Sequence, residues 1–220
     1  MDLIVGGGTH GLRAVRFCIA SGRPARVFDP DPACRVARFL AGSDRAGAEI
    51  GLTRGGMHET YRFYVSHKPE WVFPTAPVHV AALLVGAACG MTGRTGDLAA
   101  CTHGVPEKFC IGQSGADAYF SVNREGTCMP ECPSPDCCPV TGEDRSVPLF
   151  VQLGDWCPGA AILESVQLAP GLGAIRGSDL RAVISRFRDQ SSGCVGTACR
   201  CHGIVTALAE CTPCPPAKMH

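Results

Sequence analysis

The strongest constraint on the fold lies near the start of the chain, where a short apolar run enters a glycine-rich turn. Residues 2–5 read as a buried parallel strand. Gly6, Gly8 and Gly11 follow with the spacing G-x-G-x-x-G, and apolar residues then recur at helical spacing over residues 12–19. This order of strand, glycine turn and helix favours an α/β fold built on a parallel sheet.

A second strand is predicted over residues 25–28, and it ends at Asp29, where an acidic side chain accepts hydrogen bonds from a ribose. Residues 4–29 resemble the dinucleotide-binding start of Rossmann proteins, including precorrin-2 dehydrogenases and TrkA-type nucleotide-binding domains. The resemblance implies that the three glycines admit a pyrophosphate and that Asp29 contacts the ribose of NAD(P). The alternative is a turn whose glycines serve packing alone.

The β-then-α rhythm continues to residue 88 and predicts a Rossmann-like parallel sheet over residues 1–100. Apolar spacing predicts helices over 33–40, 57–67 and 78–88, and strands over 49–52 and 70–73.

The break after the strand at 70–73 falls at the edge where parallel sheets bind ligands. Thr75 lies in this break, and His79 is expected in the first turn of the next helix, where the helix dipole lowers the pKa of an imidazole and keeps it neutral. We therefore treat His79 and Thr75 as the candidate catalytic residues. A purely structural histidine is the alternative.

Cysteine is the abnormal residue of this composition, with fifteen in 220 residues, four of them within residues 128–138. That stretch is threaded with prolines, which exclude a helix or central strand and hold thiolates close together at little entropic cost. Its spacing, C-x3-C-x4-C-C, ends in Cys-Pro as ferredoxin motifs do. We predict a [4Fe–4S] cluster on Cys128, Cys132, Cys138 and one distant cysteine, with Cys137 beside them.

Further cysteines are available as metal ligands in the last third of the chain. Zinc is the alternative to the cluster, although the one C-x2-C pair, Cys211 and Cys214, lies in a proline-rich tail. Several cysteines could instead be small buried apolar residues. The additional candidate metal ligands are Cys157, Cys194, Cys199 and Cys201.

Residues 101–220 are predicted to form a second, cysteine-rich metal-binding α/β segment. Strands are expected over 118–122, 161–166 and 203–208, and a helix capped by Ser178. Residues 170–173 form a glycine turn that we expect to reverse the chain.

The charge balance limits the partners, because 20 basic residues against 20 acidic ones give no electrostatic attraction to nucleic acid. No stretch reaches the length of a membrane span, so we expect a cytoplasmic protein. A hydrolase is set aside because no G-x-S-x-G elbow occurs.

A nucleotide site beside a thiolate cluster indicates an NAD(P)-dependent iron–sulfur oxidoreductase or electron-transfer component with a redox protein partner. Nicotinamide transfers two electrons and a cluster accepts one, so direct exchange calls for an intermediary such as flavin, of which no motif is visible. The alternatives are a redox or metal sensor without turnover, and a tetrapyrrole or cluster-assembly protein, in which His103 and His202 are further ligands. A homo-oligomer is left open.

Overall fold

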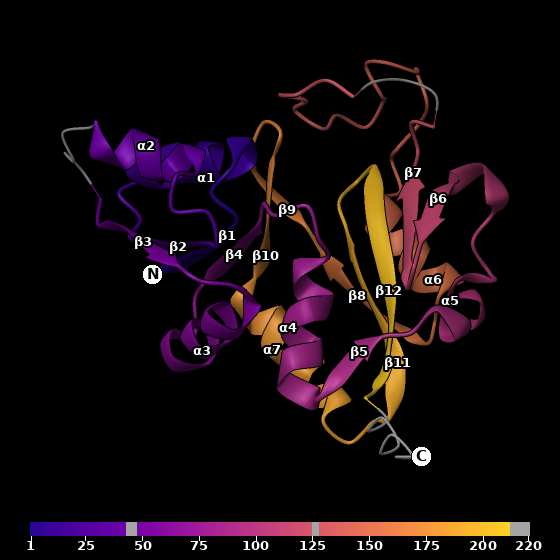
Figure 1. Ribbon diagram of the computed structural model, residues 1–220. Coiled ribbons are helices and arrows are strands. Elements are labelled where there is room, and N and C mark those ends of the chain that lie inside the picture. Colours follow the sequence, from indigo (N-terminus) through magenta and orange to yellow (C-terminus); the bar gives the residue numbers. More distant parts are fainter. Residues whose placement is uncertain (43–47, 125–127, 212–220) are drawn as a thin grey trace, which may run out of the picture.

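The computed structural model describes residues 1–42, 48–124 and 128–211 and shows a mixed α/β protein with two mixed sheets (Figure 1). The helices are α1 (Thr9–Ala20), α2 (Arg35–Ala41), α3 (Met57–His67), α4 (Val80–Cys89), α5 (Thr95–Thr102), α6 (Leu149–Trp156) and α7 (Gly177–Phe187), with a 3-10 turn at Glu107–Phe109. In these described ranges, no helix is long and apolar enough to cross a membrane.

The strands fall into two groups by sheet. The first sheet has the order β3-β2-β1-β4-β10-β9, and the second has β6-β7-β12-β11-β8, with β5 paired to β12. Their bounds are β1 (Asp2–Val5), β2 (Ala25–Asp29), β3 (Ile50–Arg54), β4 (Trp71–Pro74), β5 (Met91–Gly93), β6 (Cys110–Ser114), β7 (Asp117–Ser121), β8 (Ala160–Glu164), β9 (Val166–Ala169), β10 (Leu172–Arg176), β11 (Ser192–Ala198) and β12 (His202–Glu210).

The four strands predicted before residue 80 are present and run parallel, in the order β3-β2-β1-β4. Side chains alternate along β1, so that Leu3 and Val5 face α4 and α7 while Ile4 packs under α1. Helices α1 and α2 cover one face of the sheet and α3 the other (Figure 1). The residues of β1 are almost fully buried, which explains the continuous apolar run in the sequence.

Two strands from the second half of the chain complete the first sheet. β10 runs antiparallel to β4, and β9 pairs with β10 in a hairpin whose turn contains Gly171 at a φ of +67°. The prediction that residues 170–173 reverse the chain is therefore confirmed. The strand predicted over 161–166 is wrong in one respect: it ends at Glu164, and Ser165 separates β8 in the second sheet from β9 in the first.

The second sheet is packed on both faces. α4 and α7 lie between the two sheets, and they share one apolar core with residues of both, including Val72 of β4 and Val195 of β11 (Figure 1). On the opposite face, α5 and α6 cover a separate core that contains Cys157. The helix predicted near residue 180 is present, but its N-cap is Arg176, and Ser178 lies in its first turn rather than capping it.

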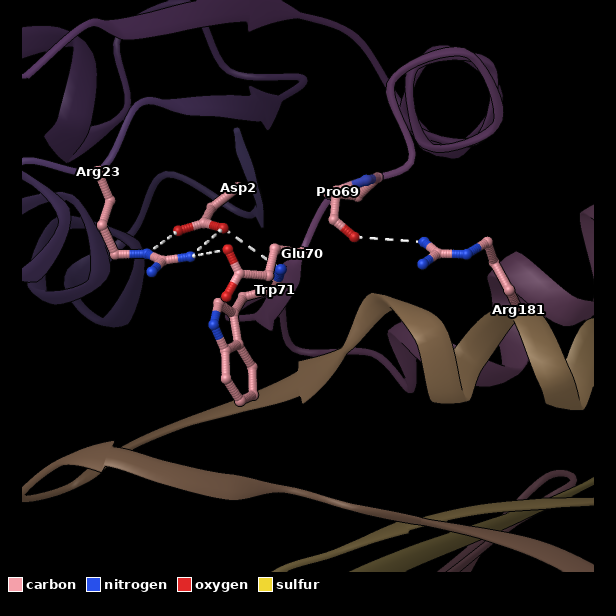
Figure 2. A network of polar contacts seen from close by, with 6 residues as sticks. All are labelled: Asp2, Arg23, Pro69, Glu70, Trp71 and Arg181. Carbon is pink, nitrogen blue, oxygen red and sulfur yellow. Dashed lines mark hydrogen bonds and ion pairs between the residues drawn. The ribbon is translucent and has the colours of Figure 1, made fainter.

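An ion pair between buried Asp2 and partly buried Arg23 lies where β1 and β4 begin (Figure 2). Asp2 is fully buried and accepts hydrogen bonds from Arg23 Nε at 2.6 Å and Nη2 at 3.0 Å. It also accepts the backbone N–H of Trp71 at 3.3 Å, and Arg23 donates to the exposed Glu70 at 2.8 Å. Asp2 thus ties β1, the segment before β2, and β4 together.

Replacing Asp2 with alanine is expected to lower the free energy of unfolding by roughly 1.5–3 kcal/mol, because charge-assisted hydrogen bonds in a buried place are lost. Glu70→Gln removes a partner that is largely in water, so its cost is expected to stay below about 1 kcal/mol. Urea denaturation of both variants measures the difference. Equal costs for the two variants would contradict the role assigned to Asp2.

Candidate functional site

The cysteine-rich segment 128–145 folds back on itself without forming a helix or a ladder-forming strand. Its two arms meet where Cys137 and Asp144 form an isolated β-bridge, where Cys138 N donates to Glu143 O at 2.8 Å, and where Arg145 N donates to Asp136 O at 2.6 Å. The prediction of an irregular, proline-stiffened loop is confirmed.

The first arm of the loop docks on the first sheet. Arg13 of α1 donates from Nη1 to Pro130 O at 2.7 Å and to Gly171 O at 3.3 Å. The backbone oxygen of Cys132 accepts hydrogen bonds from Gln167 Nε2 at 2.6 Å and from Gly171 N at 3.2 Å. In Figure 1 the loop accordingly reaches from the end of β7 toward the tip of the β9–β10 hairpin.

The second arm docks on the turn between β11 and β12. Arg200, in that turn, donates to Arg145 O at 2.8 Å and pairs with Asp136 at 2.7 Å. These contacts bring the loop to the Cys199-Arg200-Cys201-His202 segment, which lies more than fifty residues later in the sequence. The two groups of cysteines that the sequence shows therefore meet.

The turn itself places three ligand atoms together. One ligand atom each from Cys199, Cys201 and His202 lie within 4.8 Å of one another, and the two sulfurs are 3.8 Å apart. The backbone N–H groups of Cys201 and His202 donate to Cys199 Sγ at 3.5 and 3.4 Å. The Cys201 thiol donates a hydrogen bond to Cys199 Sγ, and this bond is the main reason why the pKa of Cys199 is lowered. The same bond raises the pKa of Cys201, because its thiol must keep the proton in order to donate.

Two sulfurs of the loop accept hydrogen bonds in the same manner. Cys132 Sγ accepts from Ser134 N at 3.3 Å. Burial alone would raise the pKa of Cys138, but hydrogen bonds from the Thr141 hydroxyl and from the backbone of Thr141 and Val140 hold it below its usual value. Backbone donors aimed at cysteine sulfur favour the thiolate, which is the form that binds metal.

The cysteines of the two arms lie close enough to influence one another's ionisation. Burial raises the pKa of Cys128, and the neighbouring thiols of Cys132, Cys138 and Cys199 raise it further. We call Cys128, Cys132, Cys138, Cys199 and Cys201 the thiol cluster. Three of its five members, Cys128, Cys132 and Cys138, are the loop ligands predicted from the sequence.

A cavity of about 520 Å³ opens beside the thiol cluster. Its lining combines the first arm of the loop, the β11–β12 turn and the first turn of α1. The residues that concern the site are His10, Cys128, Cys132, Cys199, Cys201 and His202.

Arg145 lies among the thiols and was not singled out from the sequence. It is 1% exposed, and its Nη2 donates to Pro135 O at 2.7 Å and Cys137 O at 3.4 Å. Its Nε has no hydrogen-bond partner among the residues that the structure describes. Burial lowers the pKa of Arg145, but the thiols around it, first those of Cys201 and Cys138, outweigh that effect.

The other predicted metal ligands lie elsewhere. Cys137 is exposed and donates to Gly142 O at 3.4 Å. Cys157 is buried in the core under α6, where burial raises its pKa to about 11. Cys194 forms a disulfide with Cys101 across that core, so its sulfur is engaged there and is not available as the metal ligand expected from the sequence.

Of the weaker ligand candidates, Cys211 is exposed, and its predicted partner Cys214 lies outside the described residues. His103 is exposed and its Nδ1 lies 2.9 Å from Ala100 O.

The three glycines of the turn differ in whether the surrounding structure has room for a side chain. Gly6 has a φ of +104°, and a Cβ there would meet Ala76 N at 2.7 Å. A Cβ on Gly11 would meet Gly6 O at 2.0 Å. Gly8, the N-cap of α1, is exposed, and a Cβ there would meet nothing within 4 Å. Packing therefore explains Gly6 and Gly11 but not Gly8.

The polar residues predicted beside the glycines are engaged in holding the turn. Asp29 accepts the backbone N–H of Gly7 at 2.5 Å and that of Asp31 at 2.8 Å. The Thr75 hydroxyl lies 2.9 Å from both Val5 O and Gly6 O. Both side chains thus have structural contacts that the sequence did not indicate, and their contacts with a ligand stay predictions.

A second cavity, of about 610 Å³, lies against the first turn of α1. Thr9, His10 and Thr75 line it on one side, and the β9–β10 hairpin lines it on the other. His10 also lines the cavity beside the thiol cluster, so the glycine turn and the cysteines are neighbours in space.

His79 belongs to a third cavity, of about 600 Å³, which also reaches Cys199 and His202. Its Nδ1 lies 2.6 Å from Thr206 Oγ1, and its Nε2 lies 2.9 Å from Thr197 Oγ1. Thr206 donates to Asp117, so it must accept from Nδ1–H, and Nε2 then accepts from Thr197. The contacts define one tautomer of a neutral imidazole.

The low pKa predicted for His79 has a different cause from the one expected. The residue is the N-cap of α4 rather than part of its first turn, and burial lowers its pKa to about 3. The structure also places His79 and Thr75 in different cavities. Together with Arg145, the residues that the sequence did not indicate are Thr197, Thr206 and Asp117, which carry no local motif.

Below pH 6.5 the unfolded chain binds a proton on His79 that the folded protein excludes, so the free energy of unfolding falls by about 1.4 kcal/mol per pH unit down to about pH 3. His79→Gln is expected to remove this part of the acid sensitivity. The exposed His103→Gln serves as control and should keep the wild-type profile. Chemical denaturation between pH 4 and 7 tests this, and parallel profiles for wild type and His79→Gln would rule it out.

Comparison with known proteins covers nearly the whole described chain. Residues 1–80 match the family model AF_1314_N, described as an uncharacterized protein, N-terminal domain, and residues 80–211 match AF_1314_C, described as its C-terminal domain. The models meet at the start of α4, whereas the sequence placed the division near residue 100.

One relative, an uncharacterized protein of Archaeoglobus fulgidus, is 33% identical over 213 residues, which cover 94% of this chain and 99% of the relative. No solved structure matches. The chain belongs to the AF_1314 family, with both of its domains in their order.

Proposed function

We propose that the protein is an iron–sulfur redox protein whose cluster is held by four of the five sulfurs of the thiol cluster. The observation that carries this proposal is the convergence of the two cysteine segments around a buried guanidinium. Three of the sulfurs, those of Cys132, Cys138 and Cys199, also accept hydrogen bonds from backbone N–H groups. Such a centre would supply one-electron transfer, for which a redox protein is the natural partner.

The donor set favours a cluster over zinc. A structural zinc ion takes four ligands in closed tetrahedral geometry, and among the described residues only Cys199, Cys201 and His202 have ligand atoms within 4.8 Å of one another. The other three thiols of the thiol cluster add donors beyond that small group, next to a cavity. Soft thiolates with hydrogen-bonded sulfurs suit iron–sulfur centres. Zinc on Cys199, Cys201 and His202 with one loop cysteine is the second fit, and metal analysis separates the two.

Anaerobically purified protein is expected to contain iron and acid-labile sulfide and to show the broad visible absorption of a [4Fe–4S] centre. Single Cys→Ser variants of the thiol cluster are expected to lose most of the iron at the four ligands, because each thiolate closes one coordination position. Iron, sulfide and zinc analysis of every variant identifies the four.

Two cysteines outside the thiol cluster provide matched controls. Cys137→Ser alters an exposed cysteine directly beside Cys138, and Cys157→Ala alters a buried cysteine in the other core. Both variants should retain wild-type iron. A wild-type protein with zinc and no sulfide, or five Cys→Ser variants that all keep their iron, would overturn the proposal.

We further propose that the first sheet is a Rossmann-like nucleotide-binding unit. The parallel order of its first four strands and the glycine turn before α1 support this, and so does Gly8, for which the fold itself gives no reason. In such a unit the free N–H groups of the first turn of α1 bind a pyrophosphate. NAD(P) is the expected ligand, and Asp29 the expected ribose contact.

Gly8→Val tests the nucleotide site without disturbing the fold, since the added side chain enters open space. We expect at least about tenfold weaker binding of NAD(H), because a side chain there blocks the approach of a phosphate. The free energy of unfolding should fall by no more than about 1 kcal/mol, since valine is a poorer N-cap of α1 than glycine. Gly11→Ala is the contrasting variant and should destabilise the turn through Gly6 O. Calorimetric NADH titration gives the affinities, and equal affinity in Gly8→Val and wild type would refute the site.

A redox sensor without turnover is the second candidate function, and one contact favours it. Arg13 belongs to α1, which begins at the glycine turn, and it binds Pro130 O of the cysteine loop. Ordering of the loop would therefore change the nucleotide affinity of the turn. Bleaching of the visible band by NADH supports the enzyme. Nucleotide affinity that depends on cluster occupancy, with no bleaching by NADH, supports the sensor.

A further inference from the structure

We propose that Arg145 is the built-in counter-cation of the metal centre and donates a hydrogen bond to one of its sulfurs, thereby stabilising the reduced, more negative state of the centre. This inference rests on the proposed iron–sulfur function and adds a residue that controls its reduction potential.

The positive charge of Arg145 is buried. Arg145 is 1% exposed, and the acceptors described for its side chain are the backbone oxygens of Pro135 and Cys137 and the sulfur of Cys132, with no carboxylate among them. The acidic residues nearby are otherwise engaged, because Asp136 pairs with Arg200 and Asp144 accepts hydrogen bonds from Ser146. A buried cation without an anion is costly. The surrounding cysteines are the source of negative charge that this position offers.

The Nε–H of Arg145 is buried and has no hydrogen-bond acceptor among the described residues. A buried donor without an acceptor costs about 1–3 kcal/mol, and native structures rarely retain one. One nitrogen, Nη2, makes both backbone contacts, to Pro135 O and Cys137 O, so the unpaired Nε–H is a separate donor in the same rigid plane. A cysteinyl sulfur or an inorganic sulfide of the centre is the acceptor that this N–H lacks.

The backbone of Arg145 is held in place by two hydrogen bonds. The backbone N of Arg145 donates to Asp136 O, and its backbone O accepts from Arg200. The first bond closes the loop on itself, and the second joins the loop to the β11–β12 turn, so that Arg145 lies where the two segments of the thiol cluster meet. The guanidinium is therefore fixed between the ligands before a metal binds, as groups that orient and tune metal sites are.

The consequence concerns electron transfer. Reduction adds one negative charge to a centre that already bears thiolates, and a positive charge in a buried place stabilises the product of that step more than the starting state. Arg145→Gln removes the charge and is expected to shift the midpoint potential to more negative values. Arg145→Lys keeps the charge but loses the planar Nε–H donor, so its potential should lie between those of wild type and Arg145→Gln.

The test is a redox titration of the full chain, purified anaerobically and followed by electron paramagnetic resonance, with iron and sulfide measured on the same samples. Iron release to a chelator provides a second measurement, because loss of an outer group that supports a metal site weakens binding by about 10–100-fold. Arg62→Gln, which alters an exposed arginine of α3, is the control for loss of a positive charge and should leave the potential and the iron-release rate unchanged.

The outcomes separate the two proposals. Wild-type protein without iron and sulfide overturns the proposed function before any variant is compared. Wild-type protein with a cluster, and an unchanged potential and iron-release rate in both Arg145 variants, overturns the role of Arg145 alone. If Arg145→Gln does not fold, the midpoint potential and the iron-release rate of Arg145→Lys test the role of Arg145 instead.

Discussion

One extended segment, residues 160–169, belongs to both sheets, and the arrangement of every candidate site depends on it. The segment runs as β8 beside β11, passes through Ser165, and continues as β9 in the other sheet. The N–H of Ser165 donates to Ala198 O at 2.7 Å, which fixes the crossing next to the β11–β12 turn. Ser165 lines all three cavities, so the glycine turn, the thiol cluster and His79 surround the point where the chain changes sheets.

This crossing explains how cysteines far apart in sequence come together. β9 continues into the hairpin on which the first arm of the cysteine loop docks, through the backbone oxygen of Cys132. β8 pairs with β11, whose end leads into Cys199. The loop therefore bridges two structures that the crossing has already placed side by side. Prolines and hydrogen bonds to sulfur then orient the thiols locally.

Local patterns in the sequence were sufficient for the elements of the first ninety residues, but they missed β5, α5, β6, β9, β10, α6 and β11 and did not predict how the sheets assemble. The first four strands and the helices between them follow from apolar spacing, glycines and prolines. The crossing at Ser165 could not be predicted, because residues 160–169 show one continuous strand pattern and the change of sheet is a tertiary choice.

The site residues show the same division between local and long-range information. Cys128, Cys132 and Cys138 were predicted together from their spacing. Cys199 and Cys201 were separate candidates, and only the structure shows that they lie next to the loop. Arg145 could not be recognised, because an arginine on a polar loop is ordinary until its burial is known. For His79 the direction of the pKa shift was predictable but its cause, burial between two sheets, was not.

The cysteine loop is ordered at a cost in backbone entropy that a bound centre would offset. The segment buries Cys132, Cys138 and Arg145, yet it forms no helix or ladder-forming strand to offset the entropy of ordering its backbone. Metal–thiolate bonds supply folding free energy of this kind, and they also provide the negative charge that the guanidinium lacks. Arg13 of α1 holds the loop at Pro130, so the free energy of filling the proposed centre would be coupled to the helix that begins at the glycine turn. A redox or occupancy change at the cysteines would then reach the proposed nucleotide site through this one side chain of α1.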